Sequence, residues 1–207
     1  MGGVTSSVGR KRLIAGTGRA PLVERRGDLY ETPIVAVHAL LQVEPLPGVI
    51  WECACGPGSI VKVLRDAGHN VLATDLHDYG CPDSESRVDF LMERAPSFAV
   101  GAVLTNPPYK LAADFVEHAM LLGIPKIVML LRLQFIESEA RRSILDRGML
   151  ARVHVFRKRL PMMHRAGWDG PRASNAMTYT WFVWEAAHRG RTELNRISWA
   201  NPQPEGR

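Results

Sequence analysis

The segment VLTNPPYK, residues 103–110, ends an apolar run in a rigid turn that carries polar groups. Its two prolines lack backbone N–H donors and have fixed φ angles, so neither a central strand nor a helix interior would contain them. The Asn106 side-chain oxygen and the Pro107 carbonyl can both accept hydrogen bonds from a planar amine, such as that of adenine. Two such acceptors would draw the amine toward a more nucleophilic geometry, while Tyr109 could stack on the base. The alternative is an ordinary Pro-Pro turn after a strand.

A second group with chemical potential is ECACGPG, residues 52–58, which lies between a predicted strand and a predicted helix. Gly56 and Gly58 would let the backbone turn tightly and approach a ligand at the carboxyl end of the strand. The third glycine of the dinucleotide fingerprint is absent, and no Gly-Lys-Ser of a P-loop follows. Because Cys53 and Cys55 have no second cysteine pair, we predict buried thiols and no metal site.

Acidic residues follow the next predicted strand and a later loop. Asp75 ends the strand seventeen residues after Gly58, where a carboxylate can hold two ribose hydroxyls. The alternative for Asp75 is a helix cap. Asp89 and Phe90 could accept a hydrogen bond from an exocyclic amine and stack on a purine, although a core Phe beside a surface Asp is a commoner arrangement. These residues therefore predict a nucleoside-containing cofactor.

These groups need an element order that brings them to one place. Short apolar runs predict strands at residues 49–51, 71–74, 100–105, 126–133, 152–156 and 179–184. Helical patterns cover residues 59–67, 111–122 and 137–147, and another helix begins at Pro33. This alternation predicts an α/β fold with a parallel sheet, and the last two strands would form an antiparallel hairpin at one edge. The groups described above would then share the carboxyl edge of the sheet.

Composition limits the classes of protein that this chain can be. It has 207 residues, 46% of them hydrophobic, and a formal net charge of +5, which suits either a polyanionic partner or an ordinary basic enzyme. Three cysteines are too few for a disulfide framework, so we expect a reducing cytoplasm. The longest apolar run, residues 127–131, is too short to span a bilayer, and the first residues lack the apolar core of a signal peptide. We therefore expect no contact with a membrane.

Polar stretches divide the chain into three parts. Residues 1–27 read as a flexible basic arm, residues 28–187 as the folded domain and residues 188–207 as a polar tail. Within the domain, residues 157–177 are too long for a hairpin turn and contain five basic residues against one acid. Loops of this length are usually functional or disordered. We expect this loop to contact phosphates, with a disordered insertion as the alternative.

With these motifs in this order, the chain resembles a class I S-adenosylmethionine-dependent methyltransferase of the amino-methylating type. It is most similar to the small N6-adenine DNA methyltransferases of phages and prophages. Further segments that resemble this group are residues 28–33, 130–142 and 180–184. The resemblance implies a Rossmann-like fold, with a mostly parallel seven-stranded sheet and a C-terminal antiparallel hairpin. It implies that the catalytic tetrapeptide is Asn106, Pro107, Pro108 and Tyr109. It also implies that the cofactor is held by Tyr30, Thr32, Glu52, Cys53, Ala54, Gly56, Gly58, Asp75, Leu76, Asp89, Phe90 and Asn106.

The resemblance further implies direct methyl transfer to an adenine flipped out of duplex DNA, in a bacterial or phage-infected cell. Nucleic acid would then be contacted by Lys110, Arg132, Arg157, Lys158, Arg159, His164, Arg165, Trp168 and Arg172. Three alternatives stay open: methylation of RNA bases, methylation of a protein glutamine amide, or a DNA-binding protein with a degenerate fold. The chain has no separate recognition domain like that of the larger restriction-type enzymes, so neither the recognition site nor the oligomeric state follows from the sequence.

Overall fold

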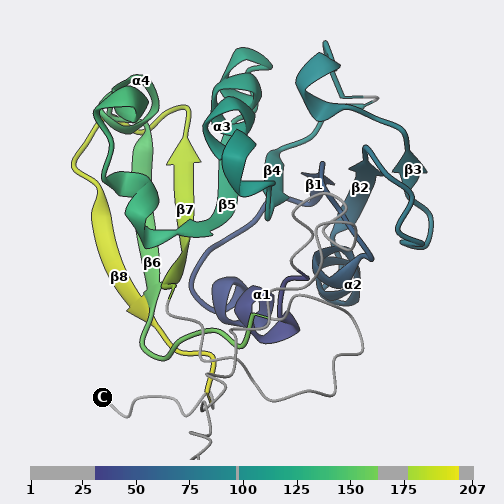
Figure 1. The fold of residues 1–207 in the computed structure, drawn as a ribbon, viewed down its shortest axis with the longest axis horizontal. Coiled ribbons are helices and arrows are strands. Elements are labelled where there is room, and N and C mark those ends of the chain that lie inside the picture. Colours follow the sequence, from purple (N-terminus) through teal and green to yellow (C-terminus); the bar gives the residue numbers. More distant parts are fainter. Residues whose placement is uncertain (1–30, 97, 163–176, 201–207) are drawn as a thin grey trace, which may run out of the picture.

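The computed structural model describes residues 31–96, 98–162 and 177–200 (Figure 1). The helices are α1 Ile34–Leu41, α2 Ser59–Asp66, α3 Ala112–Leu121 and α4 Arg142–Leu145. The strands are β1 Val49–Glu52, β2 Asn70–Asp75, β3 Glu85–Ser86, β4 Ala102–Thr105, β5 Lys126–Arg132, β6 Leu150–Phe156, β7 Tyr179–Glu185 and β8 Glu193–Ile197. Short 3₁₀ turns cover Phe90–Met92, Tyr109–Leu111, Leu133–Ile136 and Glu139–Arg141. Strands and helices thus alternate over the first part of the chain, as predicted.

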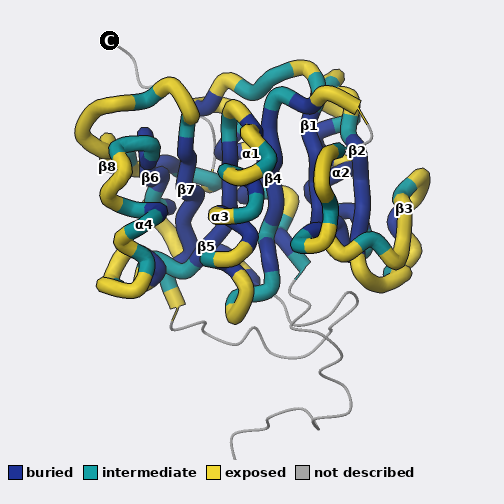
Figure 2. Tube along the Cα trace, turned by 90° about the horizontal axis from the view of Figure 1, so that it is seen from above, coloured by how far each residue is buried: buried dark blue, intermediate teal, exposed yellow. Residues whose placement is uncertain are grey.

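The strands form one mixed sheet in the order β3-β2-β1-β4-β5-β7-β6-β8. All neighbouring strands are parallel except β7, which is antiparallel to both β5 and β6. The carboxyl ends of β1, β2, β4, β5, β6 and β8 therefore meet at one edge of the sheet, and β7 begins there. Figure 2 shows the central strands as buried, whereas β3 and β8 at the two ends are largely exposed.

Helices cover both faces of the sheet, which explains why β5 is apolar along almost its whole length. Ile127, Met129 and Leu131 belong to the core beneath α3 and α4. Val128 and Leu130 belong to the core beneath α1 and α2. Figure 1 shows these two helical layers separated by the strands. Because successive side chains of a strand point to opposite faces, β5 contributes to both cores.

Buried tryptophans connect the layers by hydrogen bonds as well as by packing. On β7, the Trp181 Nε1–H donates to the Ala36 carbonyl of α1 at 3.0 Å, while the Trp184 Nε1–H donates to the Ile144 carbonyl of α4 at 2.9 Å. Both rings are fully buried, so these bonds satisfy donors that would otherwise be costly to bury. Strand β7 therefore holds helices on both faces of the sheet.

Several details differ from the sequence-based expectations. The sheet of the described residues has eight strands, not the seven that the resemblance implied, and β3 and β8 are additional to the six strands predicted from apolar runs. Strand β8 lies within the stretch predicted to be a polar tail, where Leu194 is 66% exposed and only Ile197 is buried. The C-terminal hairpin of β6 and β7 is therefore not at the edge, since β8 covers β6. The helix expected over 137–147 is a 3₁₀ turn followed by the short α4. Among the residues that the structure describes, no helix is long and apolar enough to cross a membrane.

Candidate active site

The three groups singled out in the sequence open on a single cavity of about 270 Å³. It lies where β1, β2 and β4 end, at the carboxyl edge of the sheet. This is the edge at which open α/β sheets bind their ligands. The lining residues are Glu31, Thr32, Cys53, Ala54, Cys55, Gly56, Pro57, Ser59, Ile60, Asp75, Leu76, His77, Tyr79, Val88, Asp89, Phe90, Asn106, Pro108, Leu111 and Phe115.

The glycine loop needs glycine at two positions for physical reasons. Gly56 and Gly58 have φ angles of +52° and +95°, in the left-handed region that side chains disfavour. Gly58 also has no room, because a Cβ there would lie 2.7 Å from the Cys81 Sγ. The turn closes through a hydrogen bond of 2.9 Å from the Gly58 N–H to the Cys55 carbonyl, and α2 starts directly after it. Cys55 is buried, as is Cys53, in agreement with the predicted buried thiols.

Asp75 lines the cavity and ties two of its loops together. One carboxylate oxygen accepts from the Gly56 N–H at 2.9 Å, and the other accepts from the His77 N–H at 2.9 Å. Each carboxylate oxygen can accept more than one hydrogen bond, so these contacts leave acceptor capacity for a ligand. The side chain thus orders the glycine loop in addition to facing the cavity.

Glu52 is a fully buried carboxyl group directly behind the cavity. Its Oε1 accepts from the Ala54 N–H at 3.1 Å, whereas Oε2 has no hydrogen-bond partner among the described residues. Burial is the main reason why the pKa of Glu52 is raised to about 8, and the nearby negative charge of Asp75 acts in the same direction. Glu52 and Gly58 were both predicted to bind the cofactor; neither is among the residues that line the cavity, although both are next to residues that do.

The tetrapeptide turn leaves β4 and runs into a 3₁₀ turn before α3. The Asn106 Nδ2 donates to the Thr32 Oγ1 at 3.0 Å, which fixes the plane of the side-chain amide. Thr32 is buried, and it reaches the site from the segment that precedes α1. Asn106 and Pro108 line the same cavity as Gly56. The turn and the glycine loop are therefore parts of one site.

Tyr109, the last residue of the tetrapeptide, is held by two side chains from other strands. Its hydroxyl donates to the Tyr179 hydroxyl at 2.9 Å, and the two ring centroids are 5.8 Å apart. The Arg132 guanidinium carbon lies 4.3 Å from the centre of the Tyr109 ring. Arg132 was predicted as a nucleic-acid contact, but Tyr179 was not predicted at all, because nothing in an apolar strand marks its first residue as functional.

Asp89 and Phe90, which were predicted to contact a purine, both make contacts within the protein. The Asp89 Oδ1 caps a 3₁₀ turn by accepting from the Leu91 N–H at 3.1 Å. The Phe90 ring is only 2% exposed and packs against Trp51 and Phe115, with centroids 5.1 and 4.9 Å away. Its faces are therefore largely taken by the core, although both residues do border the cavity.

Sequence reasoning missed residues of the loop after β2. His77 and Tyr79 line the cavity beside Asp75, and their rings pack edge to face with centroids 5.8 Å apart. Leu76, which was predicted, lies in the same loop and is 52% exposed. The one sequence signal that could have identified His77 and Tyr79 is their position shortly after Asp75, the acid that ends β2.

Basic residues gather at the same edge of the sheet. Lys110 is exposed next to the tetrapeptide, and Arg157, Lys158 and Arg159 are exposed where β6 ends. The Trp199 Nε1–H donates to the Lys158 carbonyl at 2.8 Å, and the Lys158 Nζ lies 5.0 Å from the centre of the Trp199 ring. The segment after β8, once expected to be a tail, thus holds the start of the basic loop.

The remaining predicted site residues lie outside the described part of the chain. These residues are Tyr30, His164, Arg165, Trp168 and Arg172.

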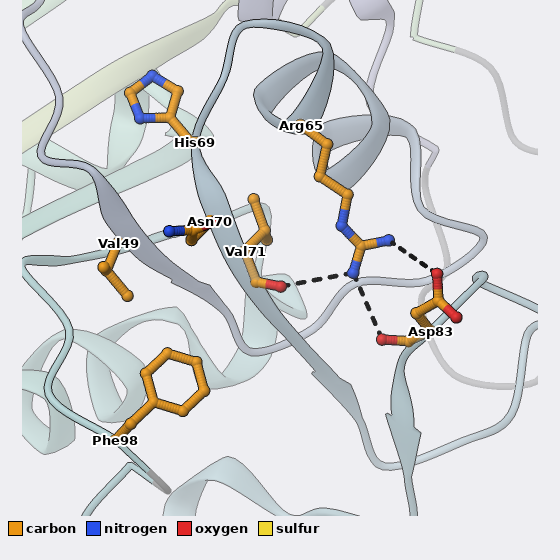
Figure 3. A pocket seen from close by; sticks show the side chains of 7 residues that line it. All are labelled: Val49, Arg65, His69, Asn70, Val71, Asp83 and Phe98. Atoms are coloured by element: carbon orange, nitrogen blue, oxygen red, sulfur yellow. Dashed lines mark hydrogen bonds and ion pairs between the residues drawn. The ribbon is translucent and has the colours of Figure 1, made fainter.

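A second hollow, of about 620 Å³, lies at the opposite edge of the sheet, where β1 and β2 begin (Figure 3). Phe98 and Val49 face it, and two of its polar side chains, Arg65 and His69, already contact backbone carbonyls. Arg65 donates to the Val71 and Asp83 carbonyls at 3.4 Å, and the His69 Nδ1 lies 2.8 Å from the Pro47 carbonyl. The hollow shares no lining residue with the cavity of the tetrapeptide, so the two are separate.

Comparison with known proteins identifies the fold. No family model matches the sequence, and no curated protein matches it. Among solved structures, one protein named as a modification subunit of a type I restriction enzyme, from Vibrio vulnificus, matches 86% of this chain with a TM-score of 0.56 and 13% identity. This chain spans about half of that subunit, 48% of its length.

Two further structures match along most of their own length. A protein from Pyrococcus horikoshii, named as an RNA methyltransferase, has a TM-score of 0.56 and 12% identity, with 81% of this chain and 90% of that chain covered. A predicted O-methyltransferase from Agrobacterium tumefaciens has a TM-score of 0.51 and 13% identity, with 81% and 86% covered. Sequence identities this low establish only the architecture. The chain has the Rossmann-like methyltransferase fold, with a mostly parallel sheet and an antiparallel hairpin.

Proposed function

We propose that this chain is an S-adenosylmethionine-dependent methyltransferase that methylates the N6 amine of adenine in DNA. One observation carries the proposal: the Asn-Pro-Pro-Tyr turn opens on the same cavity as the glycine loop and Asp75. The fold agrees with this activity, and the compared structures include proteins named for DNA modification and RNA methylation. The choice of DNA and of the N6 amine rests on the tetrapeptide and on its resemblance to small adenine methyltransferases.

The cavity is suited to the proposed cofactor. Asp75 would accept the ribose hydroxyls, and the left-handed Gly56 keeps the loop backbone close to the ligand. The exposed Leu76 and the rings of His77 and Tyr79 would cover the adenine. The unpartnered Glu52 Oε2 lies behind the loop, where a cationic ligand would favour its ionised form. When bound, S-adenosylmethionine would supply an electrophilic methyl group.

The tetrapeptide would prepare the target amine for attack. Thr32 holds the Asn106 amide by accepting from Nδ2, so that the Oδ1 is the end of this side chain able to accept from an amine. The prolines restrict the backbone on either side, which keeps the Pro107 carbonyl in place. Preorganised acceptors of this kind need no rearrangement during the reaction, which is where most of their catalytic benefit arises.

The basic residues at the same edge support a nucleic-acid substrate. Lys110, Arg157, Lys158 and Arg159 are all exposed, and phosphate contacts by such residues would offset the cost of extruding a base, a few kcal/mol. The loop residues His164, Arg165, Trp168 and Arg172 belong to the same proposal. A peptide substrate would not require a basic rim around the pocket.

The proposal is tested by incubating the protein with methyl-labelled S-adenosylmethionine and equal amounts of duplex DNA, RNA or a protein extract. We expect label in DNA, recovered as N6-methyladenine after digestion to nucleosides. An Asn106→Ala protein serves as the inactive control. Label in RNA or in glutamine would redirect the substrate assignment, and cofactor binding without any transfer would favour a degenerate DNA-binding protein.

A further inference from the structure

Tyr109 of the tetrapeptide contacts an aromatic residue, Tyr179, and a cationic residue, Arg132, that are distant from it in the sequence. We propose that Tyr179 and Arg132 position the Tyr109 ring as a rigid platform on which the target base stacks. This inference rests on the proposed function, and it adds Tyr179 as a positioning residue and gives Arg132 a second role beside phosphate contact.

Strand pairing brings the two residues together. Arg132 ends β5 and lies directly opposite Tyr179, which begins β7, in the antiparallel ladder. Residues directly opposite each other in such a pair project to the same face of the sheet, here the face covered by α1 and α2. Tyr109 packs against the same face. Three segments that are distant in sequence therefore converge at the carboxyl edge, next to the cavity.

Tyr179 is a suitable anchor because it is itself immobile. Its side chain is 3% exposed, and its hydroxyl accepts from the Tyr109 hydroxyl at 2.9 Å. Such burial rules out a direct contact between the Tyr179 ring and a duplex. Its hydroxyl can act only through Tyr109, by limiting rotation of that ring about its side-chain bonds.

Arg132 restrains the Tyr109 ring from one face. With its guanidinium carbon 4.3 Å from the ring centre, the contact has the geometry of a cation–π pair. The Arg132 Nε is buried and has no hydrogen-bond partner among the described residues, so this contact, rather than a fixed ion pair, holds the group. The contact therefore restrains the orientation of the ring against which the target base is proposed to stack.

A stacking role for Tyr109 alone predicts that Tyr109→Phe is harmless, because the ring remains. The arrangement above predicts otherwise, since Phe cannot donate to Tyr179. Losing one hydrogen bond of ordinary strength should lower kcat by about 2- to 10-fold in Tyr109→Phe. Tyr179→Phe should lower kcat by a similar factor, because it removes the other partner of the same bond.

The test is a double-mutant cycle in which kcat is measured on duplex DNA with adenine at the methylated position, located beforehand by sequencing the product. Base flipping is measured by fluorescence on the same duplex with 2-aminopurine in place of that adenine, because 2-aminopurine lacks the 6-amino group and cannot be methylated there. We expect Tyr109→Phe, Tyr179→Phe and the double variant to show similar decreases in kcat and in flipping signal, with unchanged cofactor affinity by calorimetry. Thr180→Val is the matched control, because it removes a buried hydroxyl from the same strand that bonds to His154 rather than to Tyr109. It should change thermal stability and leave flipping intact.

Multiplicative effects in the double variant, or an unchanged kcat in Tyr179→Phe, would overturn the positioning role. Arg132→Lys separates stacking from charge, since Lys keeps the charge but loses the planar guanidinium. We expect a reduced flipping signal with an unchanged salt dependence of DNA binding, and a wild-type signal would remove Arg132 from the platform. If the wild-type protein methylates no DNA at all, the proposed function fails, and that result is distinct from either outcome.

Discussion

The carboxylate of Asp75 accepts a hydrogen bond from the backbone N–H of Gly56 at 2.9 Å. The acid that ends β2 therefore also orders the glycine loop that follows β1. A second bond, from the His77 N–H, binds the loop after β2 to the same side chain. One carboxylate thus shapes the cavity before any ligand arrives, which reduces the entropy lost when a ligand binds.

Asp75→Ala should weaken S-adenosylmethionine binding by about 1.5–3 kcal/mol, because a charged acceptor for the ribose is lost. It should also lower thermal stability, since the Gly56 N–H loses its partner. Calorimetry and thermal unfolding measure the two effects. Asp66→Ala, which removes an exposed acid paired with Lys62 on α2, is the control and should leave cofactor affinity unchanged. Equal affinities of the Asp75 variant and the wild type would remove Asp75 from the binding site.

Asn106→Ala should lower kcat by about 10²–10³-fold, the usual cost of removing a preorganised polar group from a reaction centre. Cofactor affinity should largely survive, because the side chain is proposed to act mainly in the transition state. Thr32→Val should give a smaller loss, as the Asn106 amide would keep its oxygen but lose the bond that orients it. Steady-state kinetics on duplex DNA provide the measurement. A near wild-type rate for Asn106→Ala would show that the catalytic assignment is wrong.

Glu52→Gln should change how stability depends on pH. Burial raises the pKa of Glu52 to about 8, whereas in the unfolded chain it ionises near its ordinary value of 4.5. Between these values the folded protein binds one more proton than the unfolded chain, so stability falls as pH rises, by about 1.4 kcal/mol per pH unit. The variant should lack this decline. Urea unfolding at pH 5, 6.5 and 8 tests it, and parallel profiles for both proteins would contradict the protonated state of Glu52.

Glu44 should have the opposite pH dependence. Burial alone would raise its pKa, but hydrogen bonds from His154, Arg152 and Lys126 outweigh burial and lower the pKa to about 2. Its stabilising effect is therefore present above pH 4.5 and is lost as the pH falls toward 2. At pH 7, Glu44→Gln should cost about 1.5–3 kcal/mol, because Lys126 and Arg152 lose hydrogen bonds to a buried charge but keep their contacts with Glu185. The difference from the wild type should shrink on acidification.

The control for Glu44 is Glu185→Gln, which alters an acid that contacts the same two cations but is 30% exposed. Solvent screening should make its loss in unfolding free energy smaller than that of Glu44→Gln. Chemical denaturation of both variants at pH 7 and pH 3 gives the comparison. Equal losses at both pH values would mean that the Glu44 charge does not stabilise the fold.

Arg157→Ala combined with Arg159→Ala should weaken DNA binding for all sequences alike, since phosphate contacts carry no base information. The slope of log affinity against log salt should fall by about one unit per lost phosphate contact. Fluorescence anisotropy at several salt concentrations gives this slope. The control double variant, Arg189→Ala with Arg191→Ala, removes equal charge after β7 ends, at the far edge of the sheet. Identical slopes for the two double variants would exclude a specific role for the β6 residues.

The sequence by itself determined which segments form the site. Two left-handed glycines, two prolines and an acid after a strand are local requirements, and each can be recognised from neighbours in the chain. Likewise, the run of β5 is apolar because helices cover both of its faces, so its strand assignment needed no knowledge of its partners. Since parallel strands align their carboxyl ends, a shared edge for Gly56, Asp75 and Asn106 followed from element order alone.

Only the tertiary structure decided which residues meet across that edge. Strand β7 enters the sheet between β5 and β6, and this order places Tyr179 against Tyr109 and Arg132. Strand β8 has little apolar character of its own and forms by pairing with β6, so a polar stretch became part of the sheet. Such contacts depend on which strands become neighbours in the sheet, and this order is determined by packing between segments that are far apart in the sequence. The spacing of residues along the chain indicates local geometry, but it does not indicate the order of the strands in the sheet.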